Sequence, residues 1–257
     1  MKKILLKIYY WSLLSKEKTN QNQKHIRDVE WKAIAPFIKN GLFLDVGCGA
    51  GYSMERAKSE AGCVAYGIDP EPGAHGVGRS GSNYTVEAGE IKKAFAENIP
   101  FDTSMFDTVY SSHVLEHVNS EKQSLKEMER VLKDDGILII GMPTASMAFI
   151  NMVSSWLFTT HFKLVNLLLS PFIKTGKTRW WELFFPVSHS SESKTVFSDL
   201  RQYRSSRWKK AISEVFEVTH ELHPMLYPYP EYIQWFKARQ NSKFSSSVFF
   251  ICRKKTT

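Results

Sequence analysis

Several features are scarce or missing in this chain of 257 residues. Its three cysteines, Cys48, Cys63 and Cys252, are far apart and form no Cys-x-x-Cys spacing. That excludes a disulfide framework and a cysteine-type zinc site, and it indicates a reducing compartment. No uninterrupted apolar run reaches the roughly 20 residues that a membrane span needs. The apolar segment 1–14 is interrupted by Lys7 and no small-residue cleavage site follows, so we do not expect a cleaved signal peptide.

The composition otherwise fits one globular domain with elaborations. The chain is 43% apolar and 23% charged, which is ordinary for a soluble protein. A chain of this length can bury a substantial core. We therefore expect one αβ domain with an insertion rather than two separate domains.

Charge is spread unevenly along the chain, although the total is only +8. Residues 41–144 hold 9 basic and 16 acidic side chains, residues 145–257 hold 16 and 7, and residues 1–40 hold 9 and 3. An acidic middle suits a cationic ligand, whereas basic flanks suit an anionic partner such as phosphate, uronic acid, nucleic acid or anionic lipid. The alternative is that the lysines only keep the protein in solution.

A glycine-rich turn follows the first strand that we expect. Residues 44–52 read L-D-V-G-C-G-A-G-Y, which is an apolar strand end, an acid, and glycines at alternate positions. Such glycines let the backbone turn tightly and approach a ligand closely, and a following helix would direct its free N–H groups at an anionic part of that ligand. Tyr52 stands where the third glycine of a G-x-G-x-x-G dinucleotide site belongs. Alone, the turn is a weak signal for a nucleotide-type cofactor.

Three further segments give the turn its context. Val64 to Asp69 reads as a second apolar strand that ends in an acid, 22 residues after Gly47. A carboxylate about 20 residues after the first glycine reaches ribose hydroxyls in βαβ nucleotide sites. Residues 104–118 read as a strand, a short polar segment and a helix. Residues 125–142 read as an amphipathic helix, an Asp-Gly turn and a strand. In these blocks the chain resembles the class I S-adenosylmethionine-dependent methyltransferases, in particular those that act on small molecules and glycans.

The resemblance and the alternation of elements predict the same fold class. Helices that alternate with buried apolar strands favour a doubly wound, Rossmann-like α/β fold. The resemblance adds a seven-stranded, mostly parallel sheet with an antiparallel C-terminal strand. The expected helices are 25–38, 51–60, 120–132 and 199–212, and the expected strands are 42–46, 63–68, 83–87, 106–110, 137–142, 215–220 and 246–252. Residues 15–24 are polar and are expected to be a mobile link, and 71–82 a glycine-rich loop.

Four regions follow from this order. Residues 1–40 form an N-terminal helical extension, 41–144 the cofactor-binding core, 145–197 an apolar insertion, and 198–257 the C-terminal part of the fold. Two interpretations stay open for the first segment, residues 1–14: a helix packed on the fold, or a basic amphipathic segment at a membrane interface. The insertion is either a pair of helices that roof the active site or a lid that meets a lipid-linked acceptor or the membrane.

The resemblance also assigns residues to the cofactor, S-adenosyl-L-methionine. It implies that Asp45 holds the amino group and that Asp69 accepts both ribose hydroxyls. The residues expected to border the homocysteine and ribose are Gly47, Cys48, Gly49, Gly51 and Tyr52, and Ser112 completes the set. The acid that pairs with adenine after the third strand is assigned to Glu90. An alternative alignment, over residues 96–101, puts Phe95 at that place.

Residues 113–117 read H-x-x-E-H, which on a helix is typical of a zinc peptidase. No third ligand pattern follows. The segment also resembles the E-x-x-E-H of ubiquinone-biosynthesis O-methyltransferases, which binds a divalent cation, but His113 replaces the first glutamate. We therefore expect no metal, and assign His113 or His117 as a general base that takes a hydroxyl proton near neutral pH. The alternative is a histidine that only fixes the loop by hydrogen bonds.

The expected activity is transfer of a methyl group to a hydroxyl or similar nucleophile of a glycan, lipid-linked or other small anionic acceptor. The expected location is the cytoplasm, with peripheral membrane contact as an open question. Nucleic acid is disfavoured as a partner, because no RNA-binding module is recognisable outside the basic stretch 201–210. An RNA methyltransferase and a cofactor-binding protein without turnover are the alternatives.

Overall fold

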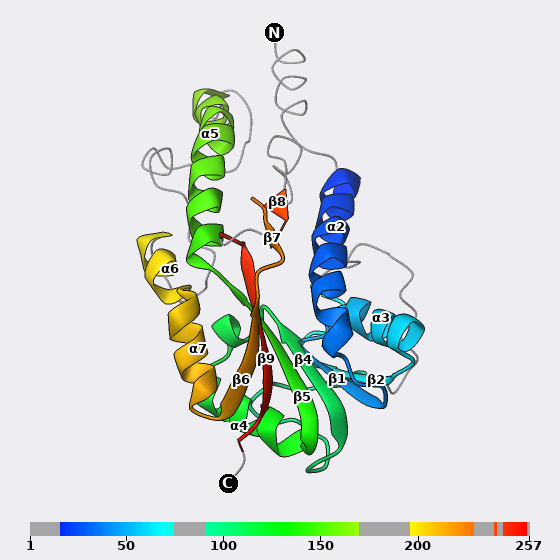
Figure 1. Cartoon of the computed structure of the whole chain (residues 1–257). Helices are drawn as coiled ribbons and strands as arrows, with labels where there is room; N and C mark the ends of the chain where they lie inside the picture. Colours follow the sequence, from blue (N-terminus) through cyan, green and yellow to red (C-terminus); the bar gives the residue numbers. More distant parts are fainter. Residues whose placement is uncertain (1–15, 75–90, 170–195, 229–238, 241–243, 256–257) are drawn as a thin grey trace.

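The computed structural model describes residues 16–74, 91–169, 196–228, 239–240 and 244–255. Seven strands form one sheet in the order β3-β2-β1-β4-β5-β9-β6 (Figure 1). The strands are β1 (Leu42–Val46), β2 (Val64–Asp69), β3 (Ile91–Lys93), β4 (Phe106–Ser112), β5 (Leu132–Pro143), β6 (Phe216–Leu222) and β9 (Ser247–Lys254). A two-stranded ribbon, β7 (Met225–Leu226) with β8 (Arg239–Gln240), lies apart from the sheet.

The sheet is doubly wound, because strand order reverses on either side of β1. β2 and β4 both pair with β1 in parallel, β3 continues one side, and β5 continues the other. β9 runs opposite to the other strands described in this sheet, since it pairs antiparallel with both β5 and β6. The predicted fold class is confirmed. In such a sheet, ligands bind beyond the carboxyl ends of the strands where the order reverses, so β1, β2 and β4 define the place to search.

Helices cover both faces of the sheet. The helices are α2 (Lys16–Ile34), α3 (Tyr52–Ala61), α4 (Glu121–Val131), α5 (Ala145–Leu169), α6 (Val196–Gln202) and α7 (Ser205–Ser213), with short turns η1 (Ala35–Phe37) and η2 (Leu115–His117). α2 and α3 pack on one face and α4 and α7 on the other, while α2 and α5 extend past the carboxyl ends of the strands (Figure 1). The described part of the chain is thus a three-layer α/β/α sandwich, and α2 and α5 extend beside the expected site.

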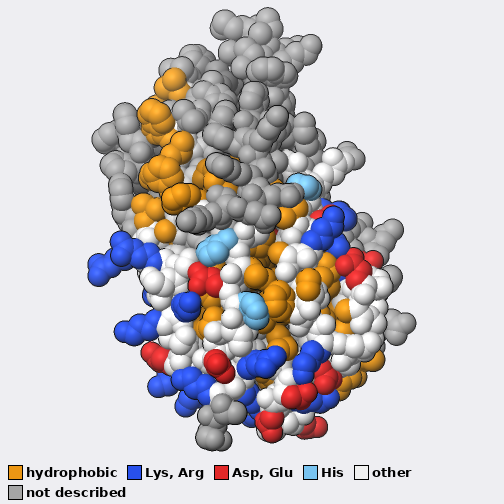
Figure 2. Space-filling model, viewed as in Figure 1, with side chains coloured by type: hydrophobic (Ala, Val, Ile, Leu, Met, Phe, Trp, Pro, Cys, Tyr) orange, Lys and Arg blue, Asp and Glu red, His pale blue; other side chains and the backbone are white. Residues whose placement is uncertain are grey.

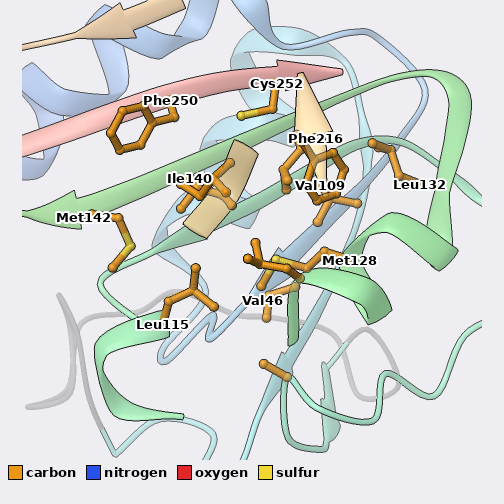
Figure 3. Packing of buried hydrophobic residues seen from close by; sticks show 14 of the residues in the cluster. Val46, Val109, Leu115, Met128, Leu132, Ile140, Met142, Phe216, Phe250 and Cys252 are labelled. Carbon is orange, nitrogen blue, oxygen red and sulfur yellow. The ribbon is translucent and has the colours of Figure 1, made fainter. Parts of the chain in front are cut away.

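Two apolar clusters, one on each face, hold the layers together. On the first face, Trp31 and Ile34 of α2 pack with Met54 of α3 against Phe43 and Ile139 of the sheet. On the second, Figure 3 shows Met128 of α4 close to Val46, Val109 and Ile140. The central strands carry apolar residues on both faces because both faces are covered, as parallel sheets require.

Local sequence explains α4 well. Ser120 caps its N-terminus, where its hydroxyl oxygen accepts a hydrogen bond from the Gln123 amide at 3.3 Å. Leu125, Met128 and Val131 follow at helical spacing and are fully buried. A capped start and one apolar stripe are what an amphipathic helix needs, and the prediction of a helix over 120–132 is confirmed.

Two predicted elements were wrong. A mobile link was expected over 15–24, but α2 begins at Lys16, so 16–24 are helical. Its polar first turns belong to a helix that Ile26, Trp31 and Ile34 anchor in the core. The expected helix 199–212 is two helices, α6 and α7. The chain breaks at Arg204, which is extended, and buried Tyr203 stacks on buried Trp208 with ring centroids 6.4 Å apart. Tertiary burial of two large aromatic rings overrides the helical period there.

The described part of the insertion is one long helix, α5. Residues 170–195 lie outside the described part of the chain, so the expected pair of helices stays a prediction. The expected strand 83–87 also lies outside it. No helix among the described residues combines the length and apolarity of a bilayer-spanning segment. α5 nonetheless leaves Phe149, Trp156 and Leu164 about half exposed, at 55%, 57% and 46%, and Figure 2 shows hydrophobic side chains gathered over this helix.

The core prediction is tested by one matched pair of substitutions. Phe250→Ala should lower the free energy of unfolding by about 3–5 kcal/mol, because it removes a fully buried ring at the centre of β9 and leaves a cavity. Phe149→Ala removes the same atoms from an exposed position and should change stability by about 0.5 kcal/mol or less. Urea unfolding of both variants measures the difference. Equal losses would contradict the assignment of the core.

Candidate cofactor site

A pocket of about 210 Å³ lies where the carboxyl ends of β1, β2 and β4 meet. It is lined by Gln23, Arg27, Asp45, Gly47, Cys48, Gly49, Ala50, Tyr52, Ser53, Asp69, Tyr110, Ser112 and His113. Seven of the predicted cofactor residues are among them: Asp45, Gly47, Cys48, Gly49, Tyr52, Asp69 and Ser112. The strand reversal and the motif residues therefore coincide, as the fold predicts.

The glycine turn is built so that a side chain would not fit. Gly47 has φ 81°, and a Cβ atom there would lie 2.3 Å from Val114 Cγ2. The amides of Gly47 and Cys48 both donate to the Ile68 carbonyl, at 2.8 and 3.0 Å, which ties the turn to the end of β2. Gly51, at φ 86°, is the N-cap of α3. The turn thus brings bare backbone and the start of a helix to the pocket wall.

Asp69 is held in place by the backbone of two loops. One carboxylate oxygen accepts from the Gly49 amide at 2.9 Å, and the other accepts from the Glu71 amide at 2.8 Å. The side chain is 5% exposed and lines the pocket. A carboxylate has about four lone-pair positions, so each oxygen keeps capacity for one more donor. That arrangement fits two vicinal hydroxyls, as the resemblance implies.

Burial dominates the electrostatics of Asp45. Burial raises the pKa of Asp45 to about 7, with a smaller contribution from the neighbouring negative charge of Asp69 and an opposing one from a hydrogen bond with Ser53. Only 3% of the side chain is exposed. A buried carboxylate that is half protonated near neutral pH gains most from a cation placed beside it. An ammonium group is such a partner.

A second pocket, of about 140 Å³, adjoins the first across Gly47. It is lined by Ile68, Pro70, Val114, His117, Val118, Asn119 and residues 94–97 in addition to Gly47. The apolar walls suit a flat ring. Glu90 lies outside the described residues, so its predicted contact with adenine stays a prediction. The residues after β3 that do line this pocket include Phe95, which the alternative alignment placed there.

The two candidate histidines lie in different places. His113 lines the first pocket, with His117 in the second. His113 has φ 56°, and its amide donates to the Gly141 carbonyl at 2.9 Å. Its Nδ1 lies 3.4 Å from Oε1 of Glu116, and the Glu116 side chain is 2% exposed. His113 Nε2 is buried and has no hydrogen-bond partner within the described residues. A left-handed residue other than glycine at a pocket is typical of functional sites.

Burial raises the pKa of Glu116, but His113 and His117 outweigh it and hold that pKa below its usual range. Glu116 is therefore an anion beside the imidazole of His113 and can orient that ring. Across the described ranges, no group of three His, Cys, Asp or Glu side chains could hold a metal ion.

Sequence reasoning missed the part of the pocket that α2 supplies. Arg27 and Gln23 line it one helical turn apart, and Tyr110 and Ser53 complete the wall. α2 is fixed to α3 by Asp28, which accepts from the Tyr52 hydroxyl at 2.5 Å and pairs with Arg56. Nothing in the spacing of 16–34 marks a ligand contact. Only the packing of α2 on α3 brings these side chains to the glycine turn.

Comparisons with known proteins agree with this geometry. Residues 44–140 match a family described as methyltransferase domain. Residues 44–140 are therefore similar to a methyltransferase domain, and the sheet has the fold of S-adenosylmethionine-dependent methyltransferases. A tRNA U34 carboxymethyltransferase of Aeromonas salmonicida is 32% identical over 124 residues, which cover 44% of this chain and 36% of that protein. The chain thus spans about a third of the length of this curated relative.

Two solved structures share the fold over most of the chain. A methyltransferase of Thermotoga maritima, titled a possible histamine N-methyltransferase, is 18% identical with a TM-score of 0.53 and covers 88% of each chain. The 1,6-didemethyltoxoflavin-N1-methyltransferase of Burkholderia thailandensis, solved with S-adenosylhomocysteine, is 12% identical with a TM-score of 0.52. It covers 90% of this chain and 78% of that chain. At such low sequence identities, the structural likeness supports the methyltransferase fold and gives no information about the methyl acceptor.

The pKa of Asp45 predicts how binding depends on pH. The dissociation constant for S-adenosylhomocysteine should rise about tenfold for each pH unit below about 7, because the carboxyl must lose its proton to face the ligand's ammonium group. Above pH 7 the constant should be flat until the ammonium group itself titrates. Titration calorimetry from pH 5.5 to 8 measures this. Asp45→Asn should bind more weakly and show no such slope, and a slope that persists in this variant would contradict the assignment.

Proposed function

We propose that this protein transfers the methyl group of S-adenosylmethionine to a hydroxyl or similar nucleophile of a glycan, lipid-linked or other small anionic acceptor. The observation that carries the donor half of the proposal is the pair of buried carboxylates, Asp45 and Asp69, at the ends of adjacent strands beside the glycine turn. One fits an ammonium group and the other fits two ribose hydroxyls. The second pocket, with its apolar walls, fits the adenine ring.

The acceptor half rests on surfaces beside the pocket. α5 leaves β5 at the carboxyl edge of the sheet, and three of its large apolar side chains are about half exposed. Residues outside the core carry the basic excess of the chain. An apolar surface combined with positive charge suits an acceptor that has a lipid or aromatic part and an anionic part. These features support this acceptor class without identifying one compound.

The sulfonium donor supplies an activated methyl group, which passes in line to the acceptor as the carbon–sulfur bond breaks and the new bond forms. The protein's own contribution is alignment and the exclusion of water, which alone can supply much of the acceleration. His113 lines the pocket and takes the acceptor's hydroxyl proton in this proposal, with Glu116 as the positioning residue that orients its ring. His117 lies at the second pocket and is a weaker candidate.

An RNA acceptor is the second candidate, because curated relatives such as the Aeromonas salmonicida protein are named tRNA U34 carboxymethyltransferases. Charge on α7 gives this candidate little support. Arg207 pairs with Glu121 at 2.6 Å, and Lys209 pairs with Glu221 at 3.2 Å, so two of its cations already face carboxylates. An RNA acceptor would bring a steep dependence of binding on salt.

Labelled donor tests the proposal directly. Protein incubated with methyl-labelled S-adenosylmethionine and separate lipid, polysaccharide, metabolite and RNA fractions should label an anionic lipid-linked, glycan or small-molecule species. Asp69→Asn should weaken donor binding roughly 10- to 100-fold, because an amide accepts hydrogen bonds from hydroxyls less strongly than a carboxylate. Asp134→Asn, at an exposed position on β5, is the matched control and should bind normally. Labelled RNA alone would favour the second candidate, and donor binding without transfer would favour a binding protein.

The role of His113 is tested once an acceptor is known. His113→Gln should lower kcat about 10²- to 10⁴-fold, the usual contribution of a general base, while donor affinity changes less than about threefold. Glu116→Gln should also lower kcat, by less than His113→Gln does, because the ring loses the carboxylate that orients it. His220→Gln, exposed on β6, is the control. Full kcat in His113→Gln would mean that the histidine only fixes the loop and that alignment suffices.

A further inference from the structure

α5 carries its buried and its exposed side chains on opposite faces. The buried residues of its first turns share one face: Met147, Ala148, Asn151 and Ser154. Phe149, Trp156 and Leu164, the apolar stripe, are about half exposed. At 3.6 residues per turn these three lie along the opposite face, and α5 contains no Asp, Glu or Arg and a single Lys. A surface helix normally turns polar residues outward, so the apolar stripe is a candidate contact surface.

Hydrogen bonds at the start of α5 fix the direction in which the stripe faces. The Thr144 hydroxyl oxygen accepts from the Met147 amide at 3.2 Å, and the hydroxyl donates to the Ser245 carbonyl. The Thr144 amide donates to the Ser246 carbonyl at 3.2 Å. Thr144 and both serines are buried. Because its cap is tied to the residues before β9, α5 keeps a fixed orientation about its axis, and the stripe keeps a fixed place on the protein.

The base of α5 lies beside the first pocket. Its first residue follows Gly141 by four positions, and Gly141 pairs with Ser112 across β5 and β4. The Gly141 carbonyl also accepts from the His113 amide at 2.9 Å. Ser112 and His113 line the pocket, and α5 extends from there past the carboxyl ends of the strands (Figure 1). A surface that contacts the stripe therefore begins close to the proposed general base.

Basic side chains border the stripe at the base of α5. α6 packs on α5, and Arg201 of α6 and Arg204, the N-cap of α7, are both exposed. Within the described part of the chain neither has a carboxylate partner, since the ion pairs of α7 involve Arg207 and Lys209. Figure 2 shows Lys and Arg side chains at the lower end of the hydrophobic band over α5. Two cations beside an apolar face are complementary to anionic lipid headgroups above acyl chains.

We propose that the apolar stripe, Arg201 and Arg204 form a surface that docks on an anionic lipid bilayer. Phe149 to Leu164 extends about 22 Å at 1.5 Å per residue, so the stripe can lie along the headgroup region. Tryptophan is enriched at that level of a membrane. A symmetric dimer through the same surface would instead gather the arginines of both copies in one interface. Charge therefore favours a bilayer over a second copy of the chain.

Docking on a bilayer deepens the proposed function. A lipid-linked acceptor stays in the membrane, and α5 would hold the pocket at the membrane surface with His113 near the acceptor's headgroup. This link to the acceptor rests on the proposed function, whereas docking itself needs no donor. Vesicle binding and donor binding can thus be measured separately on the full chain.

The probes are vesicles of phosphatidylcholine alone and vesicles that also contain phosphatidylglycerol, with binding measured by flotation. Wild-type protein should bind the anionic vesicles roughly 10- to 30-fold more strongly, the effect of two cations near the surface. Phe149→Gln with Trp156→Gln should lower binding to both kinds of vesicle by roughly 10- to 100-fold, because less apolar area enters the bilayer. Both residues are exposed, so the midpoint of thermal unfolding should not change.

The arginines are tested by the preference between vesicles. Arg201→Gln with Arg204→Gln should reduce the preference for anionic vesicles to less than about threefold. Lys92→Gln with Lys93→Gln removes two exposed cations from β3, at the other edge of the sheet, and should keep the full preference. Val64→Gln is the control for the stripe, because Val64 is 55% exposed at the amino end of β2, and it should bind vesicles as the wild type does.

Each outcome supports or overturns the inference. It is wrong if wild-type protein binds neither kind of vesicle, or if the Phe149 and Trp156 double variant binds as strongly as the wild type. It is also wrong if the wild type sediments as a dimer that the same double variant dissociates, since the stripe is then an interface between copies. Donor affinity is measured by calorimetry without vesicles. Vesicle binding without donor binding would overturn the proposed function alone, and donor binding without vesicle binding would overturn only the docking surface.

Discussion

The structure depends on two carboxylates that are buried at adjacent strand ends. A buried carboxylate needs hydrogen-bond donors or a positive charge, since isolated burial is costly. Asp69 finds its donors in the Gly49 and Glu71 amides, which fixes the glycine turn over the end of β2. Asp45 has less compensation, and its raised pKa reports that deficit. One acid thereby shapes the pocket, and the other lines it without a full set of stabilising partners.

Elements from outside the matched domain complete the pocket. α2 packs on α3 and brings Arg27 to the glycine turn, while Tyr227 and Ser247, far along the chain, hold the partner of Arg27. Burying the Arg27–Glu30 ion pair costs desolvation free energy. Removing only one partner is strongly destabilising, because it leaves an uncompensated buried charge. The position of this pair between the N-terminal helix and β9 means that the order of the donor pocket depends on the correct docking of both ends of the described chain. α2 thus lines the pocket, and residues near the C-terminal end of the described chain hold α2 in place.

Prediction from the sequence succeeded where local pattern and tertiary environment agree. β1, β2 and β4 read as apolar runs that end in polar residues because their other residues are buried on both faces, and the ends of such strands meet at one edge. It failed at residues 15–24, because their polar side chains gave no sign of a helix. The buried residues that hold this helix on the core, Ile26, Trp31 and Ile34, lie further along the chain. It also failed at 199–212, where Tyr203 and Trp208 are buried together. His113 and His117 looked equivalent in the motif, but in the structure they line different pockets, and His113 has the unusual φ of 56°.

By itself the sequence determined the cofactor class and the fold class, because glycines, strand-end acids and buried strands follow from short-range rules of backbone conformation and periodicity. Tertiary structure alone decided which side chains from distant segments share the pocket. Arg27, Ser112 and His113 are separated by up to 86 positions and meet only because α2 docks on the sheet beside α3. Contacts of this kind depend on how whole faces pack, and no spacing within one segment encodes them.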